Sequence, residues 1–267
     1  MPNLTKHLLY SLLLVMFTFV VSCKKTELPD TSKFSIEDTV NLGENIKLAI
    51  TSRPADFSIV DPKRYAQAYQ FIDNTLAEIL NTNEITYSNE YPWNVTLIQD
   101  DSVSTSFVLP GGYVFITTGL LKSYINSKSE YFSVIAHEMV YADNGFILDL
   151  LETVYSPSSL LDISLGNNPQ AASEIADFLM MTPHSESAIF DADKKTCNIV
   201  CASSYNANTF SDFMGRLFNG NVMIGWTLLH PDTGFRIPNV NGTLSQLGCD
   251  DGTEDIAIYE SFVSTLP

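Results

Sequence analysis

The segment Phe107–Tyr124, "FVLPGGYVFITTGLLKSY", decides the fold class because the period of the sequence changes there from helical to extended. Tyr113–Thr117 is a short β-branched and aromatic run of the kind that forms strands, and Trp93–Ile98 is another. Pro110–Gly112 supplies residues that turn the chain between these two runs. We therefore predict a small antiparallel sheet in this part of the chain.

Segments with helical spacing of apolar residues lie on both sides of these strands. Two amphipathic helices are predicted before them, and several helices follow a long helical segment after them. The predicted helical segments are 35–50, 61–80, 129–155, 171–181, 186–201 and 207–218, with a loop at 166–170. Helices outnumber strands and the strands lie together, which predicts a one-domain, mostly helical α+β fold.

The composition is that of an ordinary globular protein with a strong acidic excess. The chain has 267 residues, of which 45% are hydrophobic and 17% are charged, so disorder is not expected. Its 14 Lys+Arg against 31 Asp+Glu give a formal charge of -17, with no basic stripe. A phosphate backbone would be repelled, so nucleic acid is excluded as a partner.

The N-terminus has the pattern of an export signal. Lys6 precedes an apolar run from Leu8 to Val21, which is shorter than the about twenty residues of a membrane span. The run ends in Val-Val-Ser-Cys, which resembles a bacterial lipobox, so we expect residues 1–22 to be removed and Cys23 to be acylated. A plain signal peptide with a coincidental cysteine is the alternative. We interpret 23–35 as a polar tether and 36–267 as the folded domain.

Three cysteines follow Cys23, and an exported protein meets an oxidising compartment. One disulfide and one spare thiol are therefore expected. Cys197 and Cys201 lie four residues apart on a predicted helix, which rarely gives good disulfide geometry. This favours Cys249 as the partner of one of them.

The predicted helix after the strands contains "IAHEMVYADNG", residues 135–145, which begins like the H-E-x-x-H signature of zinc peptidases. In that signature two histidines share one helix face, and the glutamate between them acts on a metal-bound water. Here Tyr141 occupies the position of the second histidine. A His-Glu pair alone is weak evidence, because it often occurs by chance.

The wider sequence resembles the zinc metallopeptidases of the CAAX-prenyl-protease and Oma type, peptidase family forty-eight, and especially their periplasmic lipoproteins. The resemblance runs from Phe34 to Cys249. Its features are the P-G-G-Y-V turn, "TGLL", "VIAHEM", "ADN", the "LGNN" loop, "DAD", "YNANTFSDFMGRL" and "LHPDTGFRI". The resemblance also implies a disulfide between Cys201 and Cys249.

Carried over to this chain, the family pattern implies a degenerate metal centre. His137 matches the first zinc ligand and Glu138 the general base, but Tyr141 stands at the second ligand position. In "IFDAD", residues 189–193, the family aspartate is Asp193, and Ile189 replaces the third ligand. Isoleucine cannot bind a metal, and tyrosine binds only as phenolate. We therefore expect no bound zinc, although zinc is the cofactor of the family.

The remaining site residues leave alternatives open. Glu186 or Asp191 is a candidate for a displaced third ligand. His230 and Arg236 match a histidine-proline element of the family and suit stabilisation of an oxyanion, but without a metal His230 is expected to be a packed or capping residue. Thr105 replaces an asparagine that the family has before the P-G-G strand.

A peptide-binding cleft is the other function that this segment suggests. Gly111 and Gly112 permit a sharp turn, and the strand that begins with Tyr113, Val114 and Phe115 is a candidate edge for pairing with an extended peptide. The alternative is that this strand only completes the sheet.

Three hypotheses about function follow. The first is a lipoprotein on the periplasmic face of the outer membrane with an inactive metallopeptidase fold, which binds unfolded polypeptides or acts as a scaffold in envelope protein quality control. The second is an active zinc endopeptidase that uses Glu138, His137 and non-standard ligands. The third is a structural lipoprotein without peptide binding.

Overall fold

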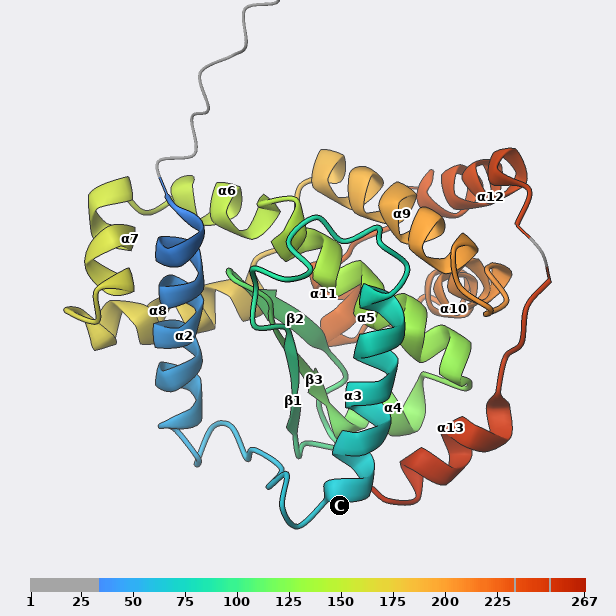
Figure 1. The fold of residues 1–267 in the computed structure, drawn as a ribbon, viewed down its shortest axis with the longest axis horizontal. Helices are drawn as coiled ribbons and strands as arrows, with labels where there is room; N and C mark the ends of the chain where they lie inside the picture. The colour runs from blue at the N-terminus through green and yellow to red at the C-terminus, as the bar shows by residue number, and fades with distance from the viewer. Residues whose placement is uncertain (1–33, 233, 250) are drawn as a thin grey trace, which may run out of the picture. The chain divides into compact units, whose positions relative to one another are not determined.

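A computed structural model describes residues 34–232, 234–249 and 251–267 of the chain. The predicted signal peptide, Cys23 and most of the predicted tether lie outside the described residues. Residues 34–267 form a compact unit around one hydrophobic core. Helices dominate the described part, which confirms the predicted α+β class (Figure 1).

Twelve helices are present in the described residues. They are α2 (Ile36–Thr51), α3 (Ala66–Leu80), α4 (Thr118–Ser123), α5 (Lys128–Asp143), α6 (Phe146–Glu152), α7 (Pro157–Ser164), α8 (Pro169–Met181), α9 (Glu186–Cys201), α10 (Asn208–Asn219), α11 (Gly225–Leu229), α12 (Arg236–Leu247) and α13 (Ile256–Val263). Within this stretch of the chain, no helix is long and apolar enough to span a bilayer.

The sheet is mixed rather than antiparallel as predicted. Its strands are β1 (Asn94–Ile98), β2 (Ser106–Leu109) and β3 (Tyr113–Thr117), in the order β1-β3-β2. β3 pairs parallel to β1 and antiparallel to β2. The prediction joined β1 directly to β3 through the Pro-Gly-Gly turn, whereas this turn joins β3 to β2, a strand that was not predicted. β3 therefore lies between its two neighbours.

The central place of β3 rules out one predicted binding mode. All five residues of this strand are buried, and its backbone groups pair with β1 on one side and β2 on the other. Tyr113, Val114 and Phe115 thus offer no free edge to a peptide, so the edge-strand interpretation is wrong. Gly111 and Gly112 have φ values of 74° and 91°, and a Cβ on Gly112 would lie 2.8 Å from the Trp93 ring. They form the tight turn between β2 and β3.

Local sequence signals explain the helix boundaries near the N-terminus. α2 begins after Ser35, whose side chain and that of Asp38 form a reciprocal capping box, as the predicted cap requires. α3 begins at Ala66, later than the predicted start at Asp61. Asp61 Oδ1 instead accepts a hydrogen bond from the Lys63 amide, a local turn that competes with helix formation.

The predicted helical segment 129–155 is broken into α5 and α6. The break lies at Gly145, which has a left-handed φ of 76°. All residues of α5 are buried, and this helix packs on β2 on one side and on α9 and α10 on the other (Figure 1). The HE motif is therefore carried by the most enclosed helix of the described fold.

The C-terminal part is more helical than predicted. α9 matches its predicted range, whereas α11, α12 and α13 were not predicted. Cys201, at the end of α9, forms the predicted disulfide with Cys249, which follows α12. Cys197 is free and buried. The bridge ties the segment after α12 to the helix that carries Asp193.

Candidate functional site

The residues expected at the metal centre do converge in the core. His137, Glu138 and Tyr141 lie on α5 with no exposed surface. Because His137 and Tyr141 are four residues apart, they share one face of the helix, and their ring centroids are 5.1 Å apart. Tyr141 thus stands beside His137, where a second ligand histidine would stand.

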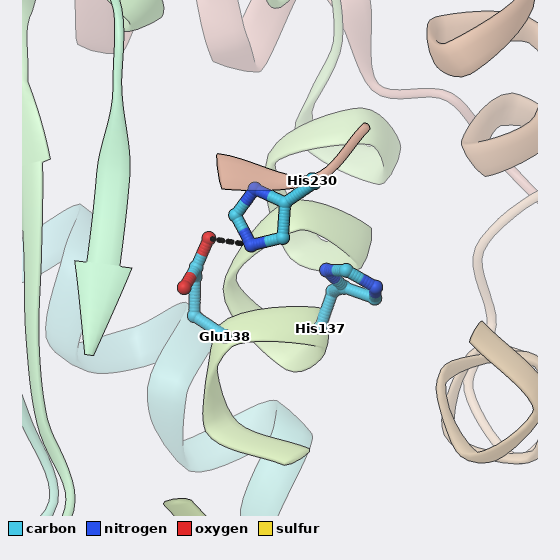
Figure 2. Close-up of side chains that lie close together, drawn as sticks. All are labelled: His137, Glu138 and His230. Atoms are coloured by element: carbon cyan, nitrogen blue, oxygen red, sulfur yellow. Dashed lines mark ion pairs between the residues drawn. The ribbon is translucent and has the colours of Figure 1, made fainter. Parts of the chain in front are cut away.

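His230 joins this group from the C-terminal half of the chain. It follows the last residue of α11, and its ring is fully buried, as expected for a packed or capping residue. Its Nε2 lies 3.5 Å from Oε1 of Glu138, and Figure 2 shows these two groups facing each other with His137 beside them. Single potential ligand atoms of the three residues all lie within 4.8 Å of one another.

Hydrogen bonds define which nitrogen of His230 carries a proton. Nδ1 lies 2.9 Å from the Trp226 carbonyl oxygen, which can only accept, so Nδ1 is the donor. Burial lowers the pKa of His230 well below 6.5 and keeps the ring neutral. Nε2 therefore presents a lone pair towards Glu138.

Glu138 is held in a form that suits this neighbour. Ser106, on β2, donates from Oγ to Glu138 Oε1 at 2.6 Å, while Oε2 has no hydrogen-bond partner in the described chain. Burial raises the pKa of Glu138 to about 7, although the bond from Ser106 opposes this shift. At neutral pH and below, a large fraction of this side chain is a neutral carboxylic acid, which is not repelled by the His230 lone pair.

A buried ion pair between Arg236 and Asp193 lies on the other side of the site. Arg236 donates from Nε and Nη2 to the two oxygens of Asp193 at 2.8 and 2.7 Å, and from Nη1 to the His230 carbonyl at 2.8 Å. Burial would raise the pKa of Asp193, but the Arg236 guanidinium holds it below its ordinary value. Three of the five N–H groups of Arg236 are thus used in bonds to Asp193 and to the His230 carbonyl, which hold the guanidinium in place.

Asp193 also fixes the ring of His137. Its Oδ1 lies 2.9 Å from His137 Nε2. Burial lowers the pKa of His137 despite the carboxylate, so the ring is neutral and donates Nε2–H to Asp193. Nδ1 is left as a buried lone pair without a partner among the described residues.

The two residues that the resemblance aligns with the other ligand positions, Tyr141 and Ile189, offer no metal ligand. Burial raises the pKa of Tyr141 well above 10, so its phenol stays protonated, and its hydroxyl has no described partner. Ile189 is buried on α9, one turn before Asp193. Glu186 and Asp191, the candidates for a displaced ligand, are both exposed, and neither belongs to the group of potential ligands formed by His137, Glu138 and His230.

The residues present do not fit the arrangement of a catalytic zinc site. It needs three protein ligands and a free carboxylate beside a metal-bound water. His137, Glu138 and His230 do have the donor chemistry to hold a metal ion. However, a metal held by this group would bind the Glu138 carboxylate itself, which would then not be free to act as the general base.

The sequence did not reveal two other members of the site, Ser106 and His184. The His184 ring stacks on Tyr141 at a centroid distance of 3.9 Å and lies 5.1 Å from His230. Burial lowers the pKa of His184 to about 3. Three of the four histidines of the chain thus meet here. The rarity of histidine in the sequence is the feature that could have marked His184 as a candidate site residue. Thr105, next to Ser106, is also buried.

Comparison with known proteins agrees with this geometry. No curated protein matches the chain. The family model of Peptidase family M48 matches residues 69–243, which is more than half of the sequence and includes the sheet, α5, α9 and His230. With the HE pair on a buried helix and Asp193 bonded to its histidine, this match establishes that the chain belongs to Peptidase family M48.

Proposed function

We propose that this chain is a non-hydrolytic member of its family that binds extended polypeptides, or acts as a scaffold for them, as a lipoprotein of the cell envelope. One observation is the main support for the proposed absence of hydrolytic activity. Tyr141 and Ile189 stand at two ligand positions, and both are buried without providing a ligand atom. The carboxylate that remains, Glu138, is sealed from solvent.

The interactions of the remaining polar groups support a metal-free core. Asp193 binds both His137 and Arg236, while Ser106 binds Glu138. A proton on Glu138 removes the repulsion between its carboxylate and the His230 lone pair, which is a role that a metal ion would otherwise fill. Such a core would give the fold a stable centre without chemistry at it.

Binding of polypeptides is supported by apolar side chains on the segments that cover the site. The His184 amide donates to the Leu229 carbonyl, which brings the end of α8 beside α11. Met181 and Leu228 on these two segments are 77% and 53% exposed. Exposed, flexible apolar side chains suit promiscuous contacts with unfolded chains.

A metal-dependent alternative is favoured by one observation, the convergence of His137, Glu138 and His230. The decisive measurement is zinc content after purification of the whole chain in the presence of zinc. We expect no stoichiometric zinc in the unaltered protein and no cleavage of an unfolded protein substrate. One zinc per chain that is lost in His230→Phe would establish the alternative.

Restoring the missing ligands is the sharper test. Tyr141→His together with Ile189→Glu should recreate two histidines and a glutamate and give tight zinc binding, whereas either substitution alone should give little. Activity should return only in part, because groups around the ligands, such as Thr105, also differ. If the double variant folds but binds no zinc, the assignment of Ile189 to the third ligand position is wrong.

The proposed location rests on the N-terminal sequence. A lipobox-like Val-Val-Ser-Cys predicts acylation of Cys23 and retention at the outer membrane, on its periplasmic face. Cys23→Ala should leave the protein unprocessed or unanchored in cell fractionation. A variant that still partitions with membranes as a mature lipoprotein would contradict the proposed anchor.

A further inference from the structure

A small cavity lies beside the core of the site and is lined by residues of α6, of the beginning of α9 and by His184. Its volume is about 220 Å³. This is less than the roughly 300–1,000 Å³ of pockets that enclose a whole small-molecule ligand. A single side chain of a larger molecule is therefore a better match in size.

The charged residues that line the cavity are both acidic. Asp149 on α6 and Asp191 on α9 are its charged residues, and no lysine or arginine lines it. Neither carboxylate has an ion-pair partner in the described residues. Two uncompensated carboxylates at one opening favour a cation, and the acidic excess of the chain adds to this attraction.

A buried polar ring forms part of the wall. His184 is only 9% exposed, and its imidazole makes no hydrogen bond within the described residues. One face of the ring stacks on Tyr141. A neutral imidazole has one donor and one acceptor nitrogen, and neither nitrogen of His184 is among the fully buried side-chain atoms without a partner. The lone pair of His184 is thus available to an N–H donor that enters the cavity.

The rest of the lining is largely apolar. Phe146, Leu150 and Ala188 contribute hydrocarbon surface to the same cavity. Lysine and arginine place a charged group at the end of a methylene stem, and such stems pack along apolar surfaces. The lining therefore matches a side chain with a cationic head and an apolar stem.

We propose that this cavity receives a lysine or arginine side chain of an extended polypeptide, with the cation between Asp149 and Asp191, an N–H directed at His184, and the stem against Phe146 and Leu150. The inference rests on the proposed polypeptide-binding function and adds selectivity for basic residues to it. The peptide backbone stays outside the cavity, because the volume admits only one side chain.

The test uses the whole chain and fluorescent nine-residue peptides of glycine and serine, with blocked ends, that differ only at the central residue. Lysine and arginine peptides should bind about tenfold more tightly than the uncharged norleucine peptide, as expected for a partly exposed ion pair with two carboxylates. Fluorescence anisotropy at low salt provides the affinities. Equal affinity for the lysine and norleucine peptides would overturn the proposal.

Matched variants separate the cavity from general charge attraction. Asp149→Asn with Asp191→Asn should abolish the preference for lysine and leave binding of the norleucine peptide unchanged. Glu152→Gln with Glu186→Gln removes the same charge from exposed positions of the same two helices and should preserve the preference. If both double variants lose the preference equally, the attraction is not local and the proposal fails.

Competition with a free amine tests whether the occupant of the cavity is a peptide side chain or a small organic cation. n-Butylammonium should compete with the lysine peptide only weakly, because it lacks the backbone contacts. Strong, Asp149-dependent binding of n-butylammonium without any peptide binding would overturn both the peptide occupant and the proposed function. Binding of all peptides without preference would refute this cavity assignment alone and leave the proposed function standing.

Discussion

Burial decides the charge state of almost every residue at the site. His137, His184 and His230 are kept neutral, and Glu138 has its pKa raised to about 7. The exception is the pair of Asp193 and Arg236, which stays charged because each group compensates the other. The centre of this protein is thus a single buried ion pair surrounded by neutral polar rings.

This arrangement predicts a large effect of breaking the ion pair. Asp193→Asn should lower the free energy of unfolding by about 3–5 kcal/mol, because it leaves the buried Arg236 without a counter-charge. The exposed pair of Arg53 and Asp177 provides the control, and Asp177→Asn should cost less than about 1 kcal/mol. Urea unfolding of both variants measures the difference. Similar losses in the two variants would show that the buried pair has no special role.

At the scale of elements, α2 is positioned by close contact with the turn between β2 and β3. Gly43, in the middle of α2, is buried against Pro110, and a Cβ there would collide with the Pro110 carbonyl oxygen and approach the Tyr113 ring to 2.8 Å. Gly242, in the middle of α12, is exposed, and a Cβ there would meet nothing within 4 Å. The two helices thus contain glycine for different reasons.

Alanine substitution should therefore have opposite effects in the two helices. Gly43→Ala should destabilise the protein by about 1–3 kcal/mol, because the added methyl overpacks a close contact. Gly242→Ala should stabilise it by up to about 1 kcal/mol through helix propensity. The urea concentrations at the unfolding midpoints, compared at an unchanged m-value, measure both changes in stability. If Gly43→Ala were stabilising, α2 would not be held against the turn in this way.

At the scale of the whole molecule, the shifted pKa values make stability depend on pH. The three buried histidines have folded-state pKa values below the ordinary 6.5, so the stability they contribute is present above pH 6.5 and is lost as the pH falls. Glu138 acts in the opposite direction. Its pKa is raised from 4.5 to about 7, so its contribution is present below pH 4.5 and is lost as the pH rises to about 7.

Between pH 6.5 and 4.5, unfolding should therefore take up protons on the three histidines, including about one on His184, whose folded-state pKa is about 3, and release up to one from Glu138. The free energy of unfolding should fall as the pH drops over this range, by about 1.4 kcal/mol per pH unit for each net proton taken up. His184→Phe, which keeps a ring on Tyr141, should flatten the slope by about one proton, and Glu138→Gln should steepen it by about one. Urea unfolding at several pH values tests both. Slopes that do not change would contradict burial of neutral groups.

The sequence by itself determined whatever depends on neighbours along the chain. Helical periodicity placed Tyr141 on the face of His137 and located α9, and the Ser35 cap marked the beginning of α2. The tyrosine at the position of the second H-E-x-x-H histidine is therefore recognisable from the order of the residues alone, as are the α+β class and, through family resemblance, the disulfide of Cys249.

Only the tertiary structure decided what depends on packing between distant segments. It placed β3 between β1 and β2, directed His230 at Glu138, locked Arg236 onto Asp193, and stacked His184 on Tyr141. None of these contacts can be predicted from the periodicity of the sequence, because the partners are many residues apart and belong to different elements. Their distances are set by how the helices pack around α5, where burial also keeps the imidazoles neutral and makes Glu138 hold its proton to about pH 7.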